Sequence, residues 1–159
     1  MRIFSAVIVS CVLMVVPAIL SAGSVGEREG WQVVSTGQSY IELLENLRAA
    51  VSAEEMGIVT DVGPTEAAAK RGEEIRGNRV VGVFRNDFAV RAVRANVAAM
   101  IEAPIRFYVT EDKDGTATLS WKTPSYVFSP YFDEGGKLRA IAEELDTIFK
   151  AIAVRATDG

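Results

Sequence analysis

The stretch Pro104–Tyr126 constrains the fold of this chain more than any other part of the sequence. Two runs within it alternate strictly between apolar and polar side chains. The apolar positions are Ile105, Phe107, Val109, Ala117, Leu119 and Trp121, and the polar positions between them are Arg106, Tyr108, Thr110, Thr118, Ser120 and Lys122. A period of two places one set on a buried face and the other toward solvent or a ligand. Asp114-Gly115 lies between the runs and suits the positive φ of a tight turn, so the stretch predicts a β-hairpin whose apolar face is covered.

The composition indicates one globular domain rather than a disordered chain. The sequence has 159 residues, of which 49% are hydrophobic and 24% are charged. A chain of this length folds as one domain of ordinary size. Because the formal net charge is −4, long-range electrostatics disfavour nucleic acid and anionic lipid as partners.

The scarcest residue types exclude several classes of active site. The sequence contains no histidine, and its single cysteine is Cys11, within an apolar N-terminal run. If that run is removed, the mature protein has neither residue. Catalytic triads that use histidine or cysteine are then excluded, metal sites built on imidazole or thiolate are excluded, and so is a disulfide framework. The sequence therefore indicates no catalytic residues, no metal and no cofactor. Any catalysis would have to use carboxylate or tyrosine chemistry.

The N-terminus is typical of an exported protein. Arg2 precedes an almost wholly apolar run, and small residues follow it near Ala22. This pattern predicts a signal peptide over residues 1–22, a linker over 23–30 and a single domain over 31–156, in a periplasmic or secreted protein. The alternative is an uncleaved segment that anchors the chain in the inner membrane, because about 18 apolar residues are close to the minimum for a span.

Periodicity and capping residues define the remaining elements. Ser39 and Glu42 form the capping-box pattern of a helix start, and Gly135-Gly136 precedes the longest helical pattern. The predicted elements are a strand over 31–36, a helix from Tyr40 past Val51, a strand over 58–62, a short helix over 65–71, a strand over 80–84, a helix from Asn86 to Ile101, the hairpin, and a long helix reaching Ile152. This order predicts an α+β fold, with a mixed or mostly antiparallel sheet and helices packed mainly on one face.

Several of these segments together resemble a known bacterial family. They are Ala67–Gly72, the strand that ends in Phe84, Ala103–Arg106 and Trp121–Tyr126, in that order. Over about Trp31 to Ala156 the chain resembles the family called domain of unknown function 302. The resemblance implies a compact α+β domain, often exported and inclined to self-associate, with no agreed activity.

One segment departs from the family pattern. Family members commonly carry Phe-Gly-Asn-Pro after the central strand, whereas this chain has Phe84-Arg85-Asn86-Asp87. If the family uses the backbone of that loop to approach a ligand, this protein does so differently or not at all.

Arg85, Arg91 and Arg94 form the first candidate ligand site. They cluster at the start of the predicted third helix, and Arg91 and Arg94 are three residues apart on one helix face. Guanidinium groups beside a helix N-terminus are suited to an anionic ligand such as a phosphate or a carboxylate. The alternative is a solvated helix face whose arginines pair with acidic residues.

Trp121 and Tyr126 form the second candidate ligand site. Phe128, Tyr131 and Phe132 follow them, and these aromatic rings can line a small-molecule pocket or a peptide groove. The alternative is that they pack in the core or across a dimer seam. The acidic residues of the predicted helices indicate no catalytic pair, because Glu42 is explained by its cap and the others fall on polar faces.

These observations predict an exported, non-catalytic α+β domain that binds a small ligand or an envelope protein. The expected assembly is a homo-oligomer, with a homodimer favoured, and neither nucleic acid nor a membrane is an expected partner. One alternative is an envelope enzyme that uses carboxylate or tyrosine chemistry. The other is a membrane-tethered interaction module, if the N-terminal segment is retained.

Overall fold

The computed structural model describes residues 25–158, so the predicted signal peptide lies outside the described residues. These residues form a five-stranded sheet in the order β1-β5-β4-β3-β2, in which every neighbouring pair is antiparallel. The strands are β1 (Trp31–Ser39), β2 (Gly57–Val62), β3 (Asn78–Phe84), β4 (Ile105–Glu111) and β5 (Thr116–Lys122). The helices are α1 (Tyr40–Ala53), α2 (Thr65–Ala69), α3 (Asn86–Ala95), α4 (Pro124–Phe128) and α5 (Lys137–Thr157), with 3₁₀ turns η1 (Val97–Glu102) and η2 (Ser129–Tyr131).

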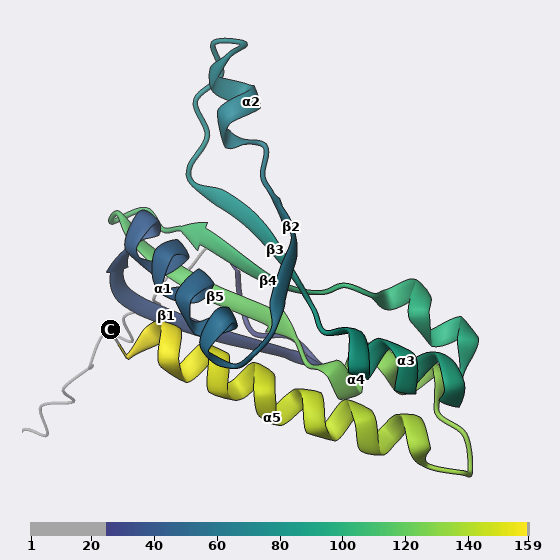
Figure 1. Ribbon diagram of the computed structural model, residues 1–159. Coiled ribbons are helices and arrows are strands. Elements are labelled where there is room, and N and C mark those ends of the chain that lie inside the picture. Colours follow the sequence, from purple (N-terminus) through teal and green to yellow (C-terminus); the bar gives the residue numbers. More distant parts are fainter. Residues whose placement is uncertain (1–24, 159) are drawn as a thin grey trace, which may run out of the picture.

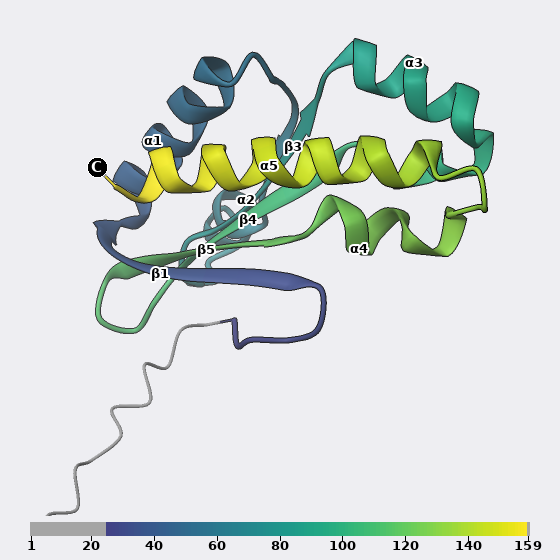
Figure 2. The same ribbon diagram turned by 90° about the horizontal axis from the view of Figure 1, so that it is seen from below.

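Helices α1 and α5 pack side by side across one face of the sheet, as Figures 1 and 2 show. The predicted α+β class, with helices mainly on one face, is therefore confirmed. The hairpin is β4–β5, and its register pairs Phe107 with Trp121. Both side chains lie beneath the helices, with exposed fractions of 0% and 6%. The apolar side of the hairpin therefore faces the core, as its alternating pattern predicts.

The start of α1 follows the predicted capping box. Ser39 Oγ accepts a hydrogen bond from the backbone amide of Glu42, and the Glu42 carboxylate accepts one from the backbone amide of Ser39. The hydrogen bonds from Ser39 hold the pKa of the Glu42 carboxyl below its ordinary value. The cap fixes where the chain leaves β1, and the stripe Leu43, Leu44, Leu47 and Val51 is then buried on the sheet.

The third helix is shorter than predicted. It ends at Ala95, because Asn96 adopts an extended conformation, with φ −157° and ψ 111°. The Asn96 side chain then accepts a hydrogen bond from the amide of Ala98 and caps the separate turn η1. Met100 and Ile101 therefore belong to η1 and not to the apolar stripe of α3. Asparagine competes for backbone hydrogen bonds in this way more readily than most residues do.

Between β2 and β3 the chain extends beyond the sheet as an arm, residues 63–77, which carries α2 (Figure 1). Its base is tightly packed. The Gly77 amide donates to the Glu111 carboxylate at 2.7 Å, and a Cβ at Gly77 would lie 2.6 Å from the Tyr40 ring. Arg79, at the start of β3, pairs with Glu66 on α2. The arm is therefore fixed to one end of the sheet.

None of the helices in residues 25–158 is long and apolar enough to cross a membrane.

Candidate functional site

The sheet face opposite α1 and α5 carries three rows of side chains, which we call the open face. No described helix lies across it, although α4 and η1 border one end (Figure 2). The pairing registers give the rows. They are Trp31, Lys122, Arg106, Gly82 and Thr60; then Val33, Ser120, Tyr108, Val80 and Val62; then Ser35, Thr118, Thr110 and Asn78. Most of the polar positions of the hairpin therefore lie on this face.

Two cations stand directly opposite each other in the first row. The register that pairs Phe107 with Trp121 places Arg106 beside Lys122 on the neighbouring strand. Both side chains are exposed, and neither forms an ion pair with any residue that the structure describes. Like charges opposite each other on adjacent strands destabilise a sheet by roughly 0.2–1 kcal/mol. An anion between them would convert that repulsion into attraction.

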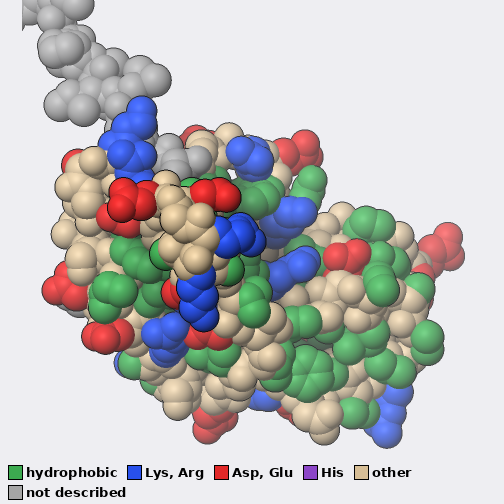
Figure 3. Space-filling model, turned by 90° about the horizontal axis from the view of Figure 1, so that it is seen from above, with side chains coloured by type: hydrophobic (Ala, Val, Ile, Leu, Met, Phe, Trp, Pro, Cys, Tyr) green, Lys and Arg blue, Asp and Glu red, His purple; other side chains and the backbone are tan. Residues whose placement is uncertain are grey.

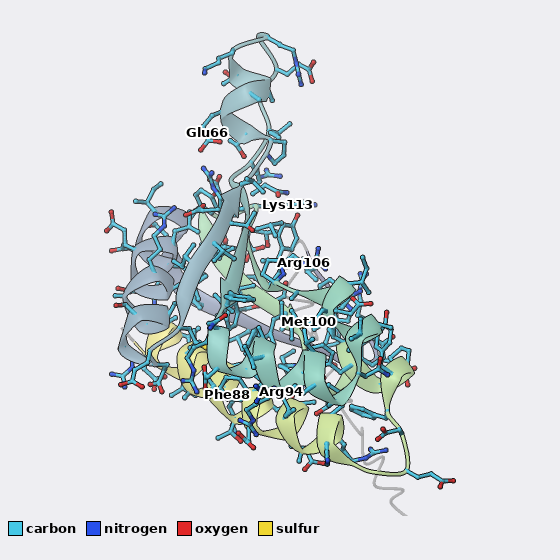
Figure 4. All side chains as sticks on the ribbon, turned by 45° about the vertical axis from the view of Figure 1, so that its right-hand side comes forward. Glu66, Phe88, Arg94, Met100, Arg106 and Lys113 are labelled. Atoms are coloured by element: carbon cyan, nitrogen blue, oxygen red, sulfur yellow. The ribbon has the colours of Figure 1, made fainter. Side chains whose placement is uncertain are left out.

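Arg106 and Lys122 line a hollow of about 440 Å³, whose other lining residues include Trp31, Tyr108, Asn78 and Glu102. Figure 4 shows Arg106 on the sheet, between Lys113 on one side and Met100 on the other. The one carboxylate in this lining is Glu102, and it accepts a hydrogen bond from the Tyr131 hydroxyl at 2.8 Å. That bond holds the pKa of the Tyr131 phenol above its ordinary value. The hollow is therefore locally basic within an acidic protein.

Two aromatic residues of the hollow, Trp31 and Tyr108, contact charged or polar side chains. The Trp31 ring lies 5.0 Å from the Arg28 guanidinium and 5.7 Å from the Lys122 ammonium, measured to the ring centroid. The Tyr108 hydroxyl oxygen accepts a hydrogen bond from the Asn78 amide at 2.6 Å. Because that oxygen is occupied as an acceptor, the phenol proton is available to a ligand. The hollow thus offers two cations, a hydroxyl donor and an indole ring.

The predicted arginine site lies elsewhere, on α3 (Figure 4). Arg85 pairs with Asp87 at 2.8 Å and lowers the pKa of that carboxyl. Arg91 donates two hydrogen bonds to Glu144 on α5, at 2.8 and 2.6 Å. Both guanidinium groups also contact the Phe88 ring, with distances of 4.4 and 5.1 Å to its centroid. Two of the three arginines therefore already have carboxylate partners.

Arg94 is the member of the predicted cluster that has no such partner among residues 25–158. With Arg91 and Lys137 it borders a shallow hollow of about 360 Å³ between α3 and α5. Anion binding at this cluster remains a prediction. The open face provides the stronger geometry, because neither of its two cations has an ion-pair partner within residues 25–158 and both stand beside hydroxyl and aromatic groups.

Trp121 and Tyr126, the other predicted ligand residues, have different environments. Trp121 packs against Phe107 with ring centroids 5.5 Å apart, and it is also one of the residues that line the 440 Å³ hollow. Tyr126 is 41% exposed and lies against Gly30, outside that lining. Trp121 is therefore mainly a core residue. The structure does not bring these two aromatic residues into one pocket.

The apolar space between α3 and α5 is too small for a ligand. Its volume is about 40 Å³, and Met56, Phe88, Met100 and Phe149 are among its lining residues. An engineered apolar cavity that binds benzene has a volume of about 150 Å³. In the described part of the chain, no group of three or more acidic side chains is arranged to hold a metal ion.

The residues of the open-face hollow were visible in the sequence as a pattern, although not as a site. Arg106 and Lys122 are equally distant from Asp114, so a hairpin that turns there must place them opposite each other. They also share the parity that faces away from the core. The register of the hairpin, together with the positive charge of both residues, could have identified this pair from the sequence. Trp31 and Asn78 come from other strands, and only the strand order brings them close.

Comparison with known proteins supports the fold. The family model described as domain of unknown function DUF302 matches residues 31–154, and the chain belongs to this family. A structural match is the crystal structure of an uncharacterized conserved DUF302 protein from Bacillus stearothermophilus. The two share 18% sequence identity and a TM-score of 0.72, over 81% of this chain and 99% of that one. No functionally curated protein matches the chain.

Proposed function

We propose that this DUF302 protein is an exported binding domain that holds a small organic anion on its open face. Arg106 and Lys122 supply the charge, Tyr108 supplies a hydroxyl donor, and Trp31 forms one wall. One observation carries the proposal: two cations are held opposite each other with no ion-pair partner among residues 25–158. Each charge-assisted hydrogen bond to a ligand contributes about 1.5–3 kcal/mol.

The basic pair has a physical cost that a bound anion would remove. The hairpin register is set by the core residues of the other face, so the Cα positions of Arg106 and Lys122 stay opposite each other unless Phe107 and Trp121 shift. The cost is small relative to core burial, and the fold tolerates it. A carboxylate or phosphate between the cations would replace repulsion by two attractive contacts.

Enzymatic use of the same hollow is the alternative. It has one observation in its favour, because Tyr108 and Lys122 line the hollow together. The hydrogen-bond partner of the phenol is Asn78, however, and not the lysine ammonium. A binding role therefore fits the contacts better. Chemical conversion of the bound ligand on prolonged incubation would favour the enzyme.

The expected homodimer and the envelope protein partner remain predictions. Val97 and Ile101 on η1 offer an apolar contact for either, because their exposed fractions are 73% and 79%. Sedimentation velocity of the full-length protein over a hundredfold range of concentration tests the homodimer. A membrane-tethered role requires retention of the N-terminal segment, which intact-mass measurement of protein from its own host would detect.

The anion site is tested by calorimetry with benzoate, citrate and inorganic phosphate at constant ionic strength. At least one of them should bind and change the fluorescence of Trp31. The Arg106→Gln variant should weaken that binding about tenfold or more, whereas Arg94→Gln should leave it unchanged. If none of the three anions binds, the proposal is wrong. If Arg94→Gln weakens binding and Arg106→Gln does not, the site is the arginine cluster on α3.

A further inference from the structure

The basic hollow is one end of a longer groove on the open face. A second hollow, of about 1050 Å³, adjoins it and shares Asn78 and Tyr108 with it. It continues beneath the arm to Thr110, Glu111 and the end of the hairpin. Figure 3 shows Lys and Arg side chains gathered across the middle of the molecule when it is viewed from the arm. A ligand at Arg106 therefore has a path along β4.

The sign of the charge changes along this path. At the far end, three carboxylates line the second hollow, against two cations. The carboxylates are Glu74, Glu111 and Asp112, and the cations are Arg76 and Lys113. One oxygen of Glu111 accepts from the Gly77 amide, and Asp112 accepts from Thr118. Glu74 is exposed. This end therefore suits a positively charged group, whereas the Arg106 end suits a negatively charged one.

The middle of the groove offers hydrogen bonds rather than charge. The Thr110 side chain lies on the open face and is only 4% exposed, and its hydroxyl has no hydrogen-bond partner among the described residues. A buried hydroxyl without a partner costs free energy unless a ligand or water satisfies it. The Tyr108 phenol proton is also available, because Asn78 occupies the phenol oxygen. Amide groups of a ligand match this middle section.

The separation between the two ends sets the length of the ligand. The groove follows β4 from Arg106 to Glu111, which are five residues apart, and this corresponds to about 17 Å along a strand. An extended peptide of four or five residues spans about 13–18 Å between its ends. It also carries an ammonium group at one end, a carboxylate at the other and amide groups between them.

We propose that the groove binds a short, extended peptide with free ends. Its C-terminal carboxylate lies between Arg106 and Lys122, and its N-terminal ammonium lies near Glu74. Its amide groups meet the hydroxyls of Tyr108 and Thr110. This inference rests on the anion site of the proposed function and adds the identity of the rest of the ligand.

Three peptides test the two ends separately by calorimetry with the full-length protein. They are tetra-alanine with free ends, its N-acetyl derivative and its C-terminal amide. The free peptide should bind about tenfold more tightly than either blocked form. If acetylation has no effect while amidation weakens binding, the ammonium end is wrong and the anion site stands. If amidation has no effect, the anion site is wrong. If no peptide binds, the peptide inference is overturned, and the benzoate, citrate and phosphate series decides the anion site.

Two variants locate the peptide in the groove. Glu74→Gln should remove most of the advantage of the free peptide over its N-acetyl form and leave the N-acetyl form unaffected. Glu45→Gln, at an exposed position on α1, is the matched control. Thr110→Val should weaken all three peptides severalfold and leave the melting temperature of the free protein unchanged or higher. Peptide affinities that are unchanged in both Glu74→Gln and Thr110→Val would overturn the placement.

Discussion

Phe107 of β4 and Phe149 of α5 stack with their ring centroids 4.8 Å apart and their planes inclined by 17°. This contact joins the middle of the hairpin to the middle of the long helix. Both side chains are almost fully buried, with exposed fractions of 0% and 1%. The stack therefore fixes α5 above the strand that carries Arg106 and Tyr108 on its other face.

Truncation of Phe149 should be among the most damaging single changes in the core. Phe149→Ala removes the stacked ring and leaves a cavity, and the expected loss is about 3–5 kcal/mol of the free energy of unfolding. Phe149→Leu keeps most of the volume, and we expect it to cost under about 1.5 kcal/mol. Urea unfolding monitored by far-UV circular dichroism measures both. A loss of less than about 1 kcal/mol in Phe149→Ala would show that the ring does not bridge helix and sheet.

Gly30 and Tyr126 form a second tight contact, just before β1. Gly30 has φ +71°, and a Cβ there would lie 2.0 Å from Cγ of the Tyr126 ring. Gly30→Ala should therefore destabilise the protein in two ways, through a left-handed backbone that costs about 1–2 kcal/mol and through the clash with the ring. Replacing Tyr126 by Ala removes only the second effect.

The double variant separates these two effects. If the contact is as described, Gly30→Ala should cost less free energy of unfolding in the Tyr126→Ala background than in the wild type. The difference should be at least about 0.5 kcal/mol, as is usual for residues in direct contact. Strictly additive losses would mean that the two residues do not touch.

The architecture was predictable because several local signals agreed. The alternation in the hairpin, the capping box at Ser39 and the long apolar stripe after Gly136 each identified one element, and the hairpin fixed an antiparallel pair. The break at Asn96 was not recognised, because the apolar residues on both sides of it continue at nearly helical spacing. One hydrogen bond that the Asn96 side chain accepts from the Ala98 amide marks the break in the helical structure.

The candidate site was less predictable than the fold. The closeness of the three α3 arginines in the sequence favoured them as a site. In the structure, however, Arg85 pairs with Asp87 and Arg91 pairs with Glu144. Glu144 is 53 residues from Arg91, so this pairing could not be read from the local sequence. Arg106 and Lys122 lie on one hairpin, but Trp31 and Asn78 come from strands distant in the sequence. Periodicity indicates which face a side chain occupies, but strand order decides its neighbours across the sheet.

The pair formed by Arg91 and Glu144 predicts a small dependence of stability on pH. The hydrogen bond from Arg91 lowers the pKa of the Glu144 carboxyl below its ordinary value of 4.5. A carboxyl whose pKa is lowered by folding stabilises the protein above its ordinary pKa, and this contribution is lost as the pH falls through the lowered value. Because the side chains of Arg91 and Glu144 are 42% and 48% exposed, solvent screening limits the effect to about 0.5 kcal/mol.

The matching measurement compares unfolding free energies of the wild type and Glu144→Gln at pH 7 and pH 3. The variant should be slightly less stable at pH 7, and the difference should shrink as the pH falls to 3. Glu143→Gln, beside it on α5, is the control and should show no difference at either pH. A difference of the same size at both pH values would assign the effect to packing rather than to charge.

The opposed cations of the open face predict that stability and binding respond in opposite directions to one substitution. Arg106→Gln removes the repulsion from Lys122, so the ligand-free protein should gain a few tenths of a kcal/mol in its free energy of unfolding. Arg106 is the better position for this test, because Lys122 also contacts the Trp31 ring. Arg94→Gln also removes an exposed guanidinium group and is the control, for which no gain is expected.

Salt provides an independent check on the same pair, because exposed charges are screened at high ionic strength. The gain in Arg106→Gln should shrink in 1 M sodium chloride and be largest at low salt. The same variant should lose anion binding, which would show that the fold retains an unfavourable pair for the benefit of a ligand. A clear loss of stability in Arg106→Gln would instead mean that Arg106 supports the sheet, and the case for a binding site there would fail.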